Sequence, residues 1–292
     1  MENFLVDLFW GNSLVVSLAS LWIIIMLTAA GLCFIVSELS QNYSQVDKLW
    51  SLMPPVYAIA TIAFFPDSGR LLIMTILAIA WGARLTWNFA RKGGYSIIPW
   101  QGDEDYRWGV LRGKHLLKGR LRFGLFNLLF ISLYQQFLIM LFSTPLLVAA
   151  AYSDKPVGWI DISAALLIIG FLTLETIADN QLFSFQKQKK GLAEKESKFE
   201  KSHKSGFMQD GLFSISRHPN WLGEQSVWVC FYLFSISASG LIINWSIAGA
   251  ALLILLFQGS AWITEGISKG KYPDYHNYIK SVPKFLPRLF RM

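Results

Sequence analysis

Long apolar runs separated by short charged segments dominate the chain. A helix needs roughly 20 apolar residues to cross the ~30 Å hydrocarbon layer of a bilayer. The base prediction is seven membrane-spanning helices, at residues 14–36, 50–65, 71–90, 125–151, 158–178, 221–243 and 245–263. The second of these is short and contains Pro54-Pro55, and the fourth is long enough to tilt. Counts of six or eight spans therefore remain open.

The distribution of Lys and Arg predicts the orientation of these helices. Eight of these residues lie in 91–122, eight in 187–217 and six after residue 263. With seven spans, these three segments face one side, and the opposite side carries only Arg70 and Lys155. Cytoplasmic loops carry the excess of Lys and Arg. The fold class predicted is therefore all-α, a polytopic integral membrane helical bundle with its N-terminus outside or lumenal and its C-terminus in the cytosol.

Composition agrees with this prediction, because 53% of the residues are hydrophobic and only 15% are charged. The net charge of +7 is concentrated beside apolar segments, so we expect membrane lipids as partners and no nucleic acid. Cys33 and Cys230 lie in apolar runs, and the four histidines lack ligand spacing, so no disulfide framework or metal site is predicted. Phosphate-loop, dinucleotide-fold and nucleophile-elbow motifs are absent from the sequence.

The acidic residues before the first span are atypical of a cleaved signal peptide, so residues 1–40 are expected to form a transmembrane anchor. Residues 41–292 are then expected to form one transmembrane domain. Such a multi-pass protein would reside in the endoplasmic reticulum of a eukaryote or in the inner membrane of a bacterium.

The stretch 211–225 combines a basic loop with the start of an apolar helix. Pro219 suits the first helical turn, because its missing N–H would have no helical partner there. Asn220 and Glu224 then lie four residues apart on one helix face, just after Arg217 and His218. A carboxylate and an amide are therefore predicted to line a site.

Other polar residues also fall at the predicted cytosolic ends of apolar helices. A charge inside a bilayer costs ~2.5 to 3.5 kcal/mol on insertion scales, so Arg84, Glu175 and Asp179 are expected to face a cavity that opens to the cytosol. Arg84 alternatively reaches the interface along its aliphatic stem. The two acids alternatively form structural ion pairs, and Glu224 alternatively serves the helix dipole.

Two further segments carry aromatic residues among charges. The loop 91–122 is suited either to a lid over a ligand or to a membrane-interface belt. The tail repeats tyrosine every third residue, at Tyr272, Tyr275 and Tyr278. A phenol there can donate to a carbonyl oxygen or hold a cofactor, and the alternative is an amphipathic helix at the headgroup level.

Residues 216–224 (Ser-Arg-His-Pro-Asn-Trp-Leu-Gly-Glu), with the tyrosine-rich tail ending in Phe285-Leu-Pro287, resemble the superfamily of membrane steroid 5-alpha-reductases and isoprenylcysteine carboxyl methyltransferases. Other motifs look like the branch grouped with the reductases (3-oxo-5-alpha-steroid 4-dehydrogenase-like). These are Asn42-Tyr-Ser-Gln-Val-Asp-Lys-Leu-Trp50, Trp81-Gly-Ala-Arg-Leu-Thr86, Gly93-Gly-Tyr95, Asp105-Tyr-Arg-Trp108 and Glu175-Thr-Ile-Ala-Asp-Asn180. The resemblance covers roughly residues 40–288.

This resemblance implies a helical bundle whose C-terminal part, about 160–288, binds a large cofactor from the cytosolic side. An apolar lipid or steroid-like substrate would enter from the membrane. In the reductases an acid and a tail tyrosine polarise the enone oxygen, which implies catalytic roles for Asp47 and for Tyr272 or Tyr275. The residues expected to bind the cofactor NADPH are Arg84, Asp179, Arg217, His218, Asn220, Glu224 and Tyr278.

In the methyltransferases, Arg-His-Pro followed by an acid holds S-adenosylmethionine, and this chain keeps Arg217-His218-Pro219. The leading hypothesis is an NADPH-dependent reductase of a conjugated C=C bond in a sterol-like or other lipid substrate. The alternative is an S-adenosylmethionine-dependent methyltransferase of a lipid or prenylcysteine. The third is a non-enzymatic lipid-binding or transport protein.

Overall fold

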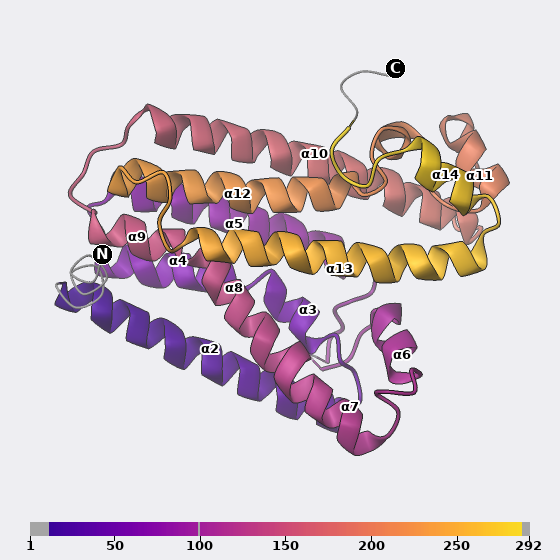
Figure 1. The fold of residues 1–292 in the computed structure, drawn as a ribbon, viewed down its shortest axis with the longest axis horizontal. Coiled ribbons are helices and arrows are strands. Elements are labelled where there is room, and N and C mark those ends of the chain that lie inside the picture. Colours follow the sequence, from indigo (N-terminus) through magenta and orange to yellow (C-terminus); the bar gives the residue numbers. More distant parts are fainter. Residues whose placement is uncertain (1–11, 99, 288–292) are drawn as a thin grey trace. The chain divides into compact units, whose positions relative to one another are not determined.

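The computed structural model describes residues 12–98 and 100–287, which form helices and connecting loops without a β-strand (Figure 1). Five helices within this part of the chain are long and apolar enough to cross a membrane. They are α2 (Ser13–Ser40), α5 (Gly69–Ala90), the helix Arg120–Ser143, α10 (Trp159–Lys189) and α13 (Ile247–Lys271). The all-helical integral membrane class is confirmed, while the count of seven spans and the orientation stay predictions.

The remaining predicted spans differ in length or polarity from the five. The second falls on two short helices, α3 (Gln45–Trp50) and α4 (Met53–Phe64), with Pro54 and Pro55 in the first turn of α4. Proline is tolerated in the first turn of a helix, but deeper in a helix it would remove a backbone hydrogen bond. Pro54 and Pro55 therefore mark the start of a new helix, and α3 and α4 stay separate. The sixth is α12 (Pro219–Ser239), which is 21 residues long and carries Asn220 and Glu224 near its start.

The fourth predicted span, 125–151, does not continue to residue 151 as one apolar helix. Its first part consists of α7 (Arg120–Phe126), a π-helical segment η1 (Asn127–Tyr134) and α8 (Gln135–Ser143). A new helix, α9 (Pro145–Ala151), follows with proline at its first position. Pro145 has no N–H to continue the hydrogen bonds of the preceding helix, so α8 ends at Ser143 and Thr144 separates it from α9.

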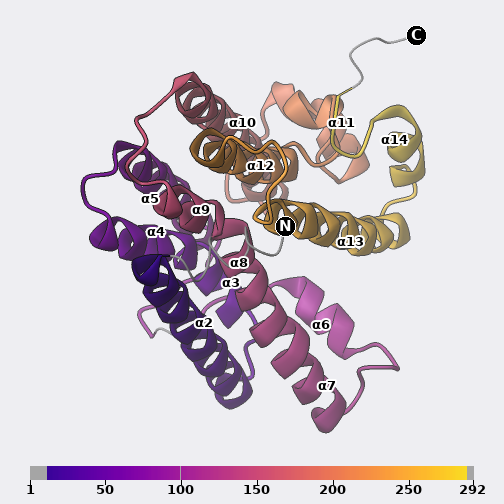
Figure 2. The same ribbon diagram turned by 60° about the vertical axis from the view of Figure 1, so that its left-hand side comes forward.

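The chain divides into two compact units. Unit 1 contains Met1–Leu166 and Val229–Leu253, and unit 2 contains Leu167–Trp228 and Ile254–Met292. The predicted boundary at residue 40 therefore lies inside unit 1. Within unit 1, α2 contacts both η1 and α8, and Figures 1 and 2 show these helices side by side.

The loop after α5 is anchored to α3 within unit 1. Gln45 donates from Nε2 to the carbonyl oxygen of Trp100 at 2.9 Å, and Lys48 donates from Nζ to that of Gln101 at 2.7 Å. The loop then leads into α6 (Tyr106–Arg112), whose Trp108 is buried with Val46 in one hydrophobic cluster. This attachment places the loop against the segment that contains Asp47.

Unit 2 is built from parts of α10, α12 and α13 and from short elements that follow them. The short elements are η2 (Ser197–Phe199), α11 (Glu200–Ser205), η3 (Gly211–Ser214) and α14 (Tyr275–Ser281). α10 and α12 approach closely, because a Cβ at Gly223 would lie 2.9 Å from the Cβ of Glu175. The helix α12 starts at Pro219 as predicted, and Leu222 donates to the carbonyl oxygen of His218 at 2.9 Å.

Candidate functional site

Arg217 connects α13 to the C-terminal tail within unit 2. Its Nε donates to Glu265 Oε1 at 2.8 Å, and its Nη2 donates to Glu265 Oε2 at 3.3 Å. Its Nη1 donates to the carbonyl oxygens of Ile279 and Val282. Both ionised side chains are buried, and burial of a charge requires such pairing. We call this arrangement of Arg217, Glu265 and the two tail carbonyls the tail clasp.

His218 belongs to the same cluster. Its Nε2 lies 3.0 Å from Glu265 Oε1, and its ring stacks on Trp221 with centroids 4.6 Å apart. The backbone N–H groups of Arg217 and His218 donate to the carbonyl oxygens of Pro283 and Lys284. The predicted cofactor residues Arg217 and His218 thus fasten the tail, and their role toward a cofactor stays a prediction.

Three predicted cofactor residues lie on the adjoining helices α10 and α12. Asn220 donates from Nδ2 to Asp179 Oδ1 at 3.3 Å, and Trp228 donates from Nε1 to Glu224 Oε1 at 3.3 Å. Asp179 and Glu224 are 3% and 4% exposed, and Glu175 is 3% exposed. The structure therefore brings Asp179 together with Asn220, and it buries the carboxyl groups of all three of these acids.

The three tail tyrosines have different environments. Tyr278 donates from its hydroxyl to the carbonyl oxygen of Phe213 at 2.6 Å, and burial raises its pKa. Tyr275 is buried with its ring centroid 4.9 Å from that of Phe207. Tyr272 is half-buried, and its hydroxyl accepts from Lys189 Nζ at 2.7 Å. Tyr275 and Tyr278 therefore pack one face of α14 against the rest of unit 2. Tyr272 lies before that helix and is not part of this face.

Asp47 lies on α3 in unit 1, with its Oδ2 accepting from Trp108 Nε1 at 3.1 Å. Burial raises the pKa of Asp47 to about 6, because it favours the neutral form more strongly than Arg107 favours the charged one. The carboxylate of Asp105 adds to the rise, and Asp105 itself pairs with Arg107 at 2.9 Å. A carboxyl group in this environment binds its proton at a higher pH than an ordinary aspartate does.

Arg84 lies on α5 in unit 1, half-buried. Farther along the same helix, Asn88 Oδ1 accepts from Arg91 Nε at 3.0 Å and from Arg91 Nη2 at 2.7 Å. Arg84 and Asp47 thus belong to unit 1, whereas the other predicted site residues belong to unit 2.

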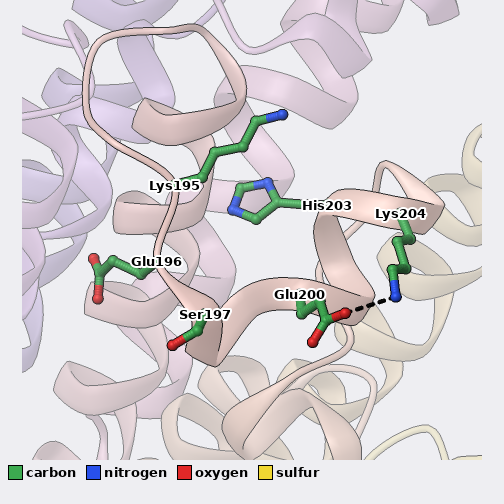
Figure 3. Close-up of a pocket in the computed structure, with 6 residues that line it drawn as sticks. All are labelled: Lys195, Glu196, Ser197, Glu200, His203 and Lys204. Carbon is green, nitrogen blue, oxygen red and sulfur yellow. Dashed lines mark hydrogen bonds and ion pairs between the residues drawn. The ribbon is translucent and has the colours of Figure 1, made fainter.

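A surface depression of about 450 Å³ in unit 2 is lined by none of the predicted site residues (Figure 3). Its lining is charged, and Lys204 pairs with Glu200, one turn earlier on α11, at 2.6 Å. His203 contributes to the lining, and its Nε2 lies 2.9 Å from Gln188 Oε1. Such a charged, open surface does not suit an apolar substrate.

The sequence analysis did not identify Glu265 or Lys189, although both contact predicted site residues. Glu265 falls two residues after the predicted end of the last span at residue 263, although α13 continues to Lys271. An acid within that apolar helix was the available signal. Lys189 stands in a run of lysines, and nothing in that pattern separates it from its neighbours.

The family model described as "Protein of unknown function (DUF1295)" matches residues 33–282. The chain belongs to this family. It is 36% identical over 265 residues to a protein of Schizosaccharomyces pombe described as "Uncharacterized protein C594.04c", and the alignment covers 87% of this chain and 75% of the yeast protein. No solved structure matches the chain.

Proposed function

We propose that this protein is a membrane-embedded, NADPH-dependent reductase of a conjugated C=C bond in a sterol-like or other lipid substrate. The observation that carries the proposal is the buried polar face of α10 and α12, where Asp179 lies within 3.3 Å of Asn220 and Glu224 is buried on the same helix as Asn220. The resemblance to the steroid 5-alpha-reductases supports the assignment of these three residues to NADPH.

The chemistry of this face fits parts of a dinucleotide. Carboxylates accept hydrogen bonds from ribose hydroxyl groups and from a carboxamide, and the Asn220 side chain both donates and accepts. The phosphates require cations, and exposed Lys187 and Lys190 stand at the end of α10 in the same unit. Asp179, Asn220 and Glu224 would hold the uncharged parts of the cofactor, and the lysines would attract its phosphates.

The reaction adds a hydride and a proton across the double bond, and NADPH supplies the hydride when bound. The protein must hold the proton near the substrate oxygen. The resemblance assigns part of this task to Asp47 of unit 1, whose pKa of about 6 makes its carboxyl group easier to protonate than that of an ordinary aspartate. A neutral carboxyl group can donate a hydrogen bond to a carbonyl oxygen and stabilise the charge that develops there.

A methyltransferase is the second candidate, and the buried acids Glu175, Asp179 and Glu224 favour it, because S-adenosylmethionine carries a positive sulfonium. The motif Arg217-His218-Pro219 is what the methyltransferase resemblance rests on, and here Arg217 and His218 bind Glu265 and the tail. The tail clasp therefore weakens the assignment of these two residues to either cofactor. The motifs shared with the reductase branch are more numerous, so we propose the reductase first.

Calorimetric titration of the purified protein in lipid nanodiscs with NADPH and with S-adenosylmethionine tests the proposal. We expect NADPH to bind and to be consumed when a steroid enone such as progesterone is added. Binding of S-adenosylmethionine alone would overturn the reductase in favour of the methyltransferase. Binding of neither cofactor would favour a non-enzymatic lipid-binding or transport protein.

Glu224→Ala gives a sharper test of the site. We expect the variant to insert and fold but to lose NADPH binding, because the buried acceptor is gone. Glu194→Ala is the matched control, since Glu194 is exposed in the same unit and is expected to leave binding unchanged. If Glu224→Ala binds NADPH as tightly as the wild type, Glu224 is not part of the site.

A further inference from the structure

The chain between α6 and α7 in unit 1 is basic and contains no acid. Residues 114–122 read Lys-His-Leu-Leu-Lys-Gly-Arg-Leu-Arg, and no Asp or Glu occurs from residue 106 to residue 153. Four cations and three leucines therefore share one short segment, which we call the basic turn. Figures 1 and 2 show it leading from α6 into α7, at the start of the apolar helix Arg120–Ser143.

Three cations of the basic turn have no partner in the protein. Within the part of the chain that the structure describes, the exposed side chains of Lys118, Arg120 and Arg122 form neither an ion pair nor a hydrogen bond. The preceding cation differs, because Arg112 pairs with Glu104 at 2.8 Å. The protein therefore leaves positive charge uncompensated on this surface.

Helix stability does not explain these cations. Arg120 and Arg122 stand in the first turn of α7, where the helix dipole places partial positive charge and favours acids. Glu38 of α2 approaches this end of the helix near Gly124, but it already accepts from Asn127 Nδ2 at 2.8 Å. The cations also repel one another, so an external anion would relieve an unfavourable local arrangement.

Exposed leucines accompany the cations. Leu116 is 83% exposed and Leu121 is 86% exposed, whereas Leu117 packs against the hydrophobic cluster that contains Trp108. The rule that places Lys and Arg in cytoplasmic loops explains the cations, but it does not explain two leucines exposed beside them. Apolar side chains next to cations suit the boundary between lipid headgroups and acyl chains, where both find partners.

The basic turn is firmly attached to the rest of unit 1. Phe123 follows it, is buried, and packs edge-to-face on Tyr43 with ring centroids 4.7 Å apart. The guanidinium of Arg112 lies 4.7 Å from the centroid of the Tyr43 ring and 5.5 Å from that of Phe123. Gly119 turns the chain into α7 with a φ of 108°, which glycine adopts without strain. These contacts fix the position of the surface.

A basic segment of unit 2 lacks these properties. Between residues 187 and 204, three acids are interspersed among its lysines. Lys198 pairs with Glu196 at 2.5 Å, and Lys204 pairs with Glu200 at 2.6 Å. The protein itself therefore neutralises part of this charge. Of the two segments, the basic turn is the one that requires an anion from outside the chain.

We propose that the basic turn is a docking surface for anionic phospholipids of the surrounding bilayer. Lys118, Arg120 and Arg122 bind the headgroup phosphates, and guanidinium groups match phosphate oxygens in a fork geometry. Leu116 and Leu121 enter the adjacent acyl region. A lipid is the source of the phosphate, because the turn begins a helix able to cross a membrane and because a soluble anion has nothing to offer the leucines. The proposal is independent of the reaction proposed above.

Native mass spectrometry in detergent with equal amounts of phosphatidylglycerol and phosphatidylcholine measures the preference for the anionic lipid. We expect phosphatidylglycerol to be retained on the wild type. Its affinity should fall about 100-fold when Lys118→Gln, Arg120→Gln and Arg122→Gln are combined, since each cation near an anionic lipid surface contributes about fivefold. An unchanged preference in this triple variant would overturn the proposal.

The matched control combines Lys195→Gln, Lys198→Gln and Lys201→Gln, which removes the same charge from exposed positions of unit 2. We expect it to keep the preference for phosphatidylglycerol. An equal loss in both triple variants would reduce the effect to net charge and overturn the assignment to the basic turn. Excess inorganic phosphate should not displace the lipid, and displacement would assign the surface to a soluble anion instead.

A fluorescent label tests the contact of the leucines with the bilayer. The native Cys33 and Cys230 are buried, so a nitrobenzoxadiazole label can be placed on Leu116→Cys. In vesicles we expect blue-shifted emission and quenching by a doxyl-labelled phospholipid, because the side chain enters the acyl region. Leu192→Cys is the matched control, since Leu192 is 69% exposed in the charged segment of unit 2 and its label should be quenched by aqueous iodide. Equal quenching of both labels by iodide would overturn the proposal.

Discussion

Unit 1 and unit 2 each contain a buried arginine paired with a buried acid, and the two pairs hold different parts of the chain. In unit 1, Arg70 at the start of α5 donates to Asp161 in the first turn of α10, from Nε at 2.9 Å and from Nη2 at 3.1 Å. Asp161 also accepts from Ser237 on α12 at 2.8 Å. This pair connects three helix ends.

In unit 2, the tail clasp connects α13 to the C-terminal end of the short helix α14. Arg217 binds Glu265 on α13 and the carbonyl oxygens of Ile279 and Val282 beyond it. The segment it fastens begins directly after α13 and carries Tyr272 and Tyr278. The same ion-pair chemistry therefore stabilises helix packing in unit 1 and positions the candidate site in unit 2. A buried arginine in an apolar chain is accordingly not by itself a ligand-binding residue.

The largest effect is expected from Arg217→Met. The change leaves Glu265 without its arginine and removes the donors to two tail carbonyls, so we expect a loss of about 3 to 5 kcal/mol in the free energy of unfolding. Denaturation in detergent measures the loss. Limited trypsin digestion should cut the tail after Lys271 or Lys280 faster than in the wild type. Normal stability with a protected tail would contradict the role of the clasp.

A smaller effect is expected from Arg70→Met. Asp161 keeps the hydroxyl of Ser237 and the N–H of Gly158, both at 2.8 Å, so we expect a loss of about 2 to 3 kcal/mol. The same denaturation experiment measures it. Digestion of the tail should remain as slow as in the wild type, because the clasp lies in the other unit. Rapid cleavage of the tail in this variant would abolish the distinction between the two pairs.

The smallest effect concerns Asp47, whose hydrogen-bond donor Trp108 is neutral. Its pKa is about 6 in the folded protein and about 4 in an unfolded chain, so the unfolded state loses its proton first. The folded state then binds more protons between these values, and stability falls as pH rises from about 4 to 6 and is flat above. Asp47→Asn should remove this slope in melting temperatures recorded across the window. The exposed Asp67→Asn should retain it, and equal slopes in both variants would contradict the assignment.

The sequence predicted the long apolar helices because roughly 20 uninterrupted apolar residues leave few alternatives in a membrane. It also predicted the start of α12, because Pro219 is compatible with a first turn and with little else in a helix. Helix ends without such a residue were predicted less well. α10 continues to Lys189 and α13 to Lys271, where long lysine side chains extend a helix beyond its apolar part.

The candidate site divides in the same way. The side chains of Asp179, Asn220 and Glu224 were recognisable because polar groups on apolar helices require partners, and the bond between Asp179 and Asn220 provides one. The alternatives for Arg217 were not separable in the sequence. Its partner Glu265 is 48 residues away, and the carbonyl oxygens that it binds belong to every residue type.

By itself, the sequence determined that this protein is an integral membrane helical bundle and that polar residues gather near the starts and ends of its helices, since both properties follow from local composition and periodicity. Only the tertiary structure decided which acid each buried arginine pairs with, and which tyrosine accepts the hydrogen bond from Lys189. Those choices depend on contacts between residues dozens of positions apart. Charge and donor capacity restrict such contacts, but the packing of the helices selects among them.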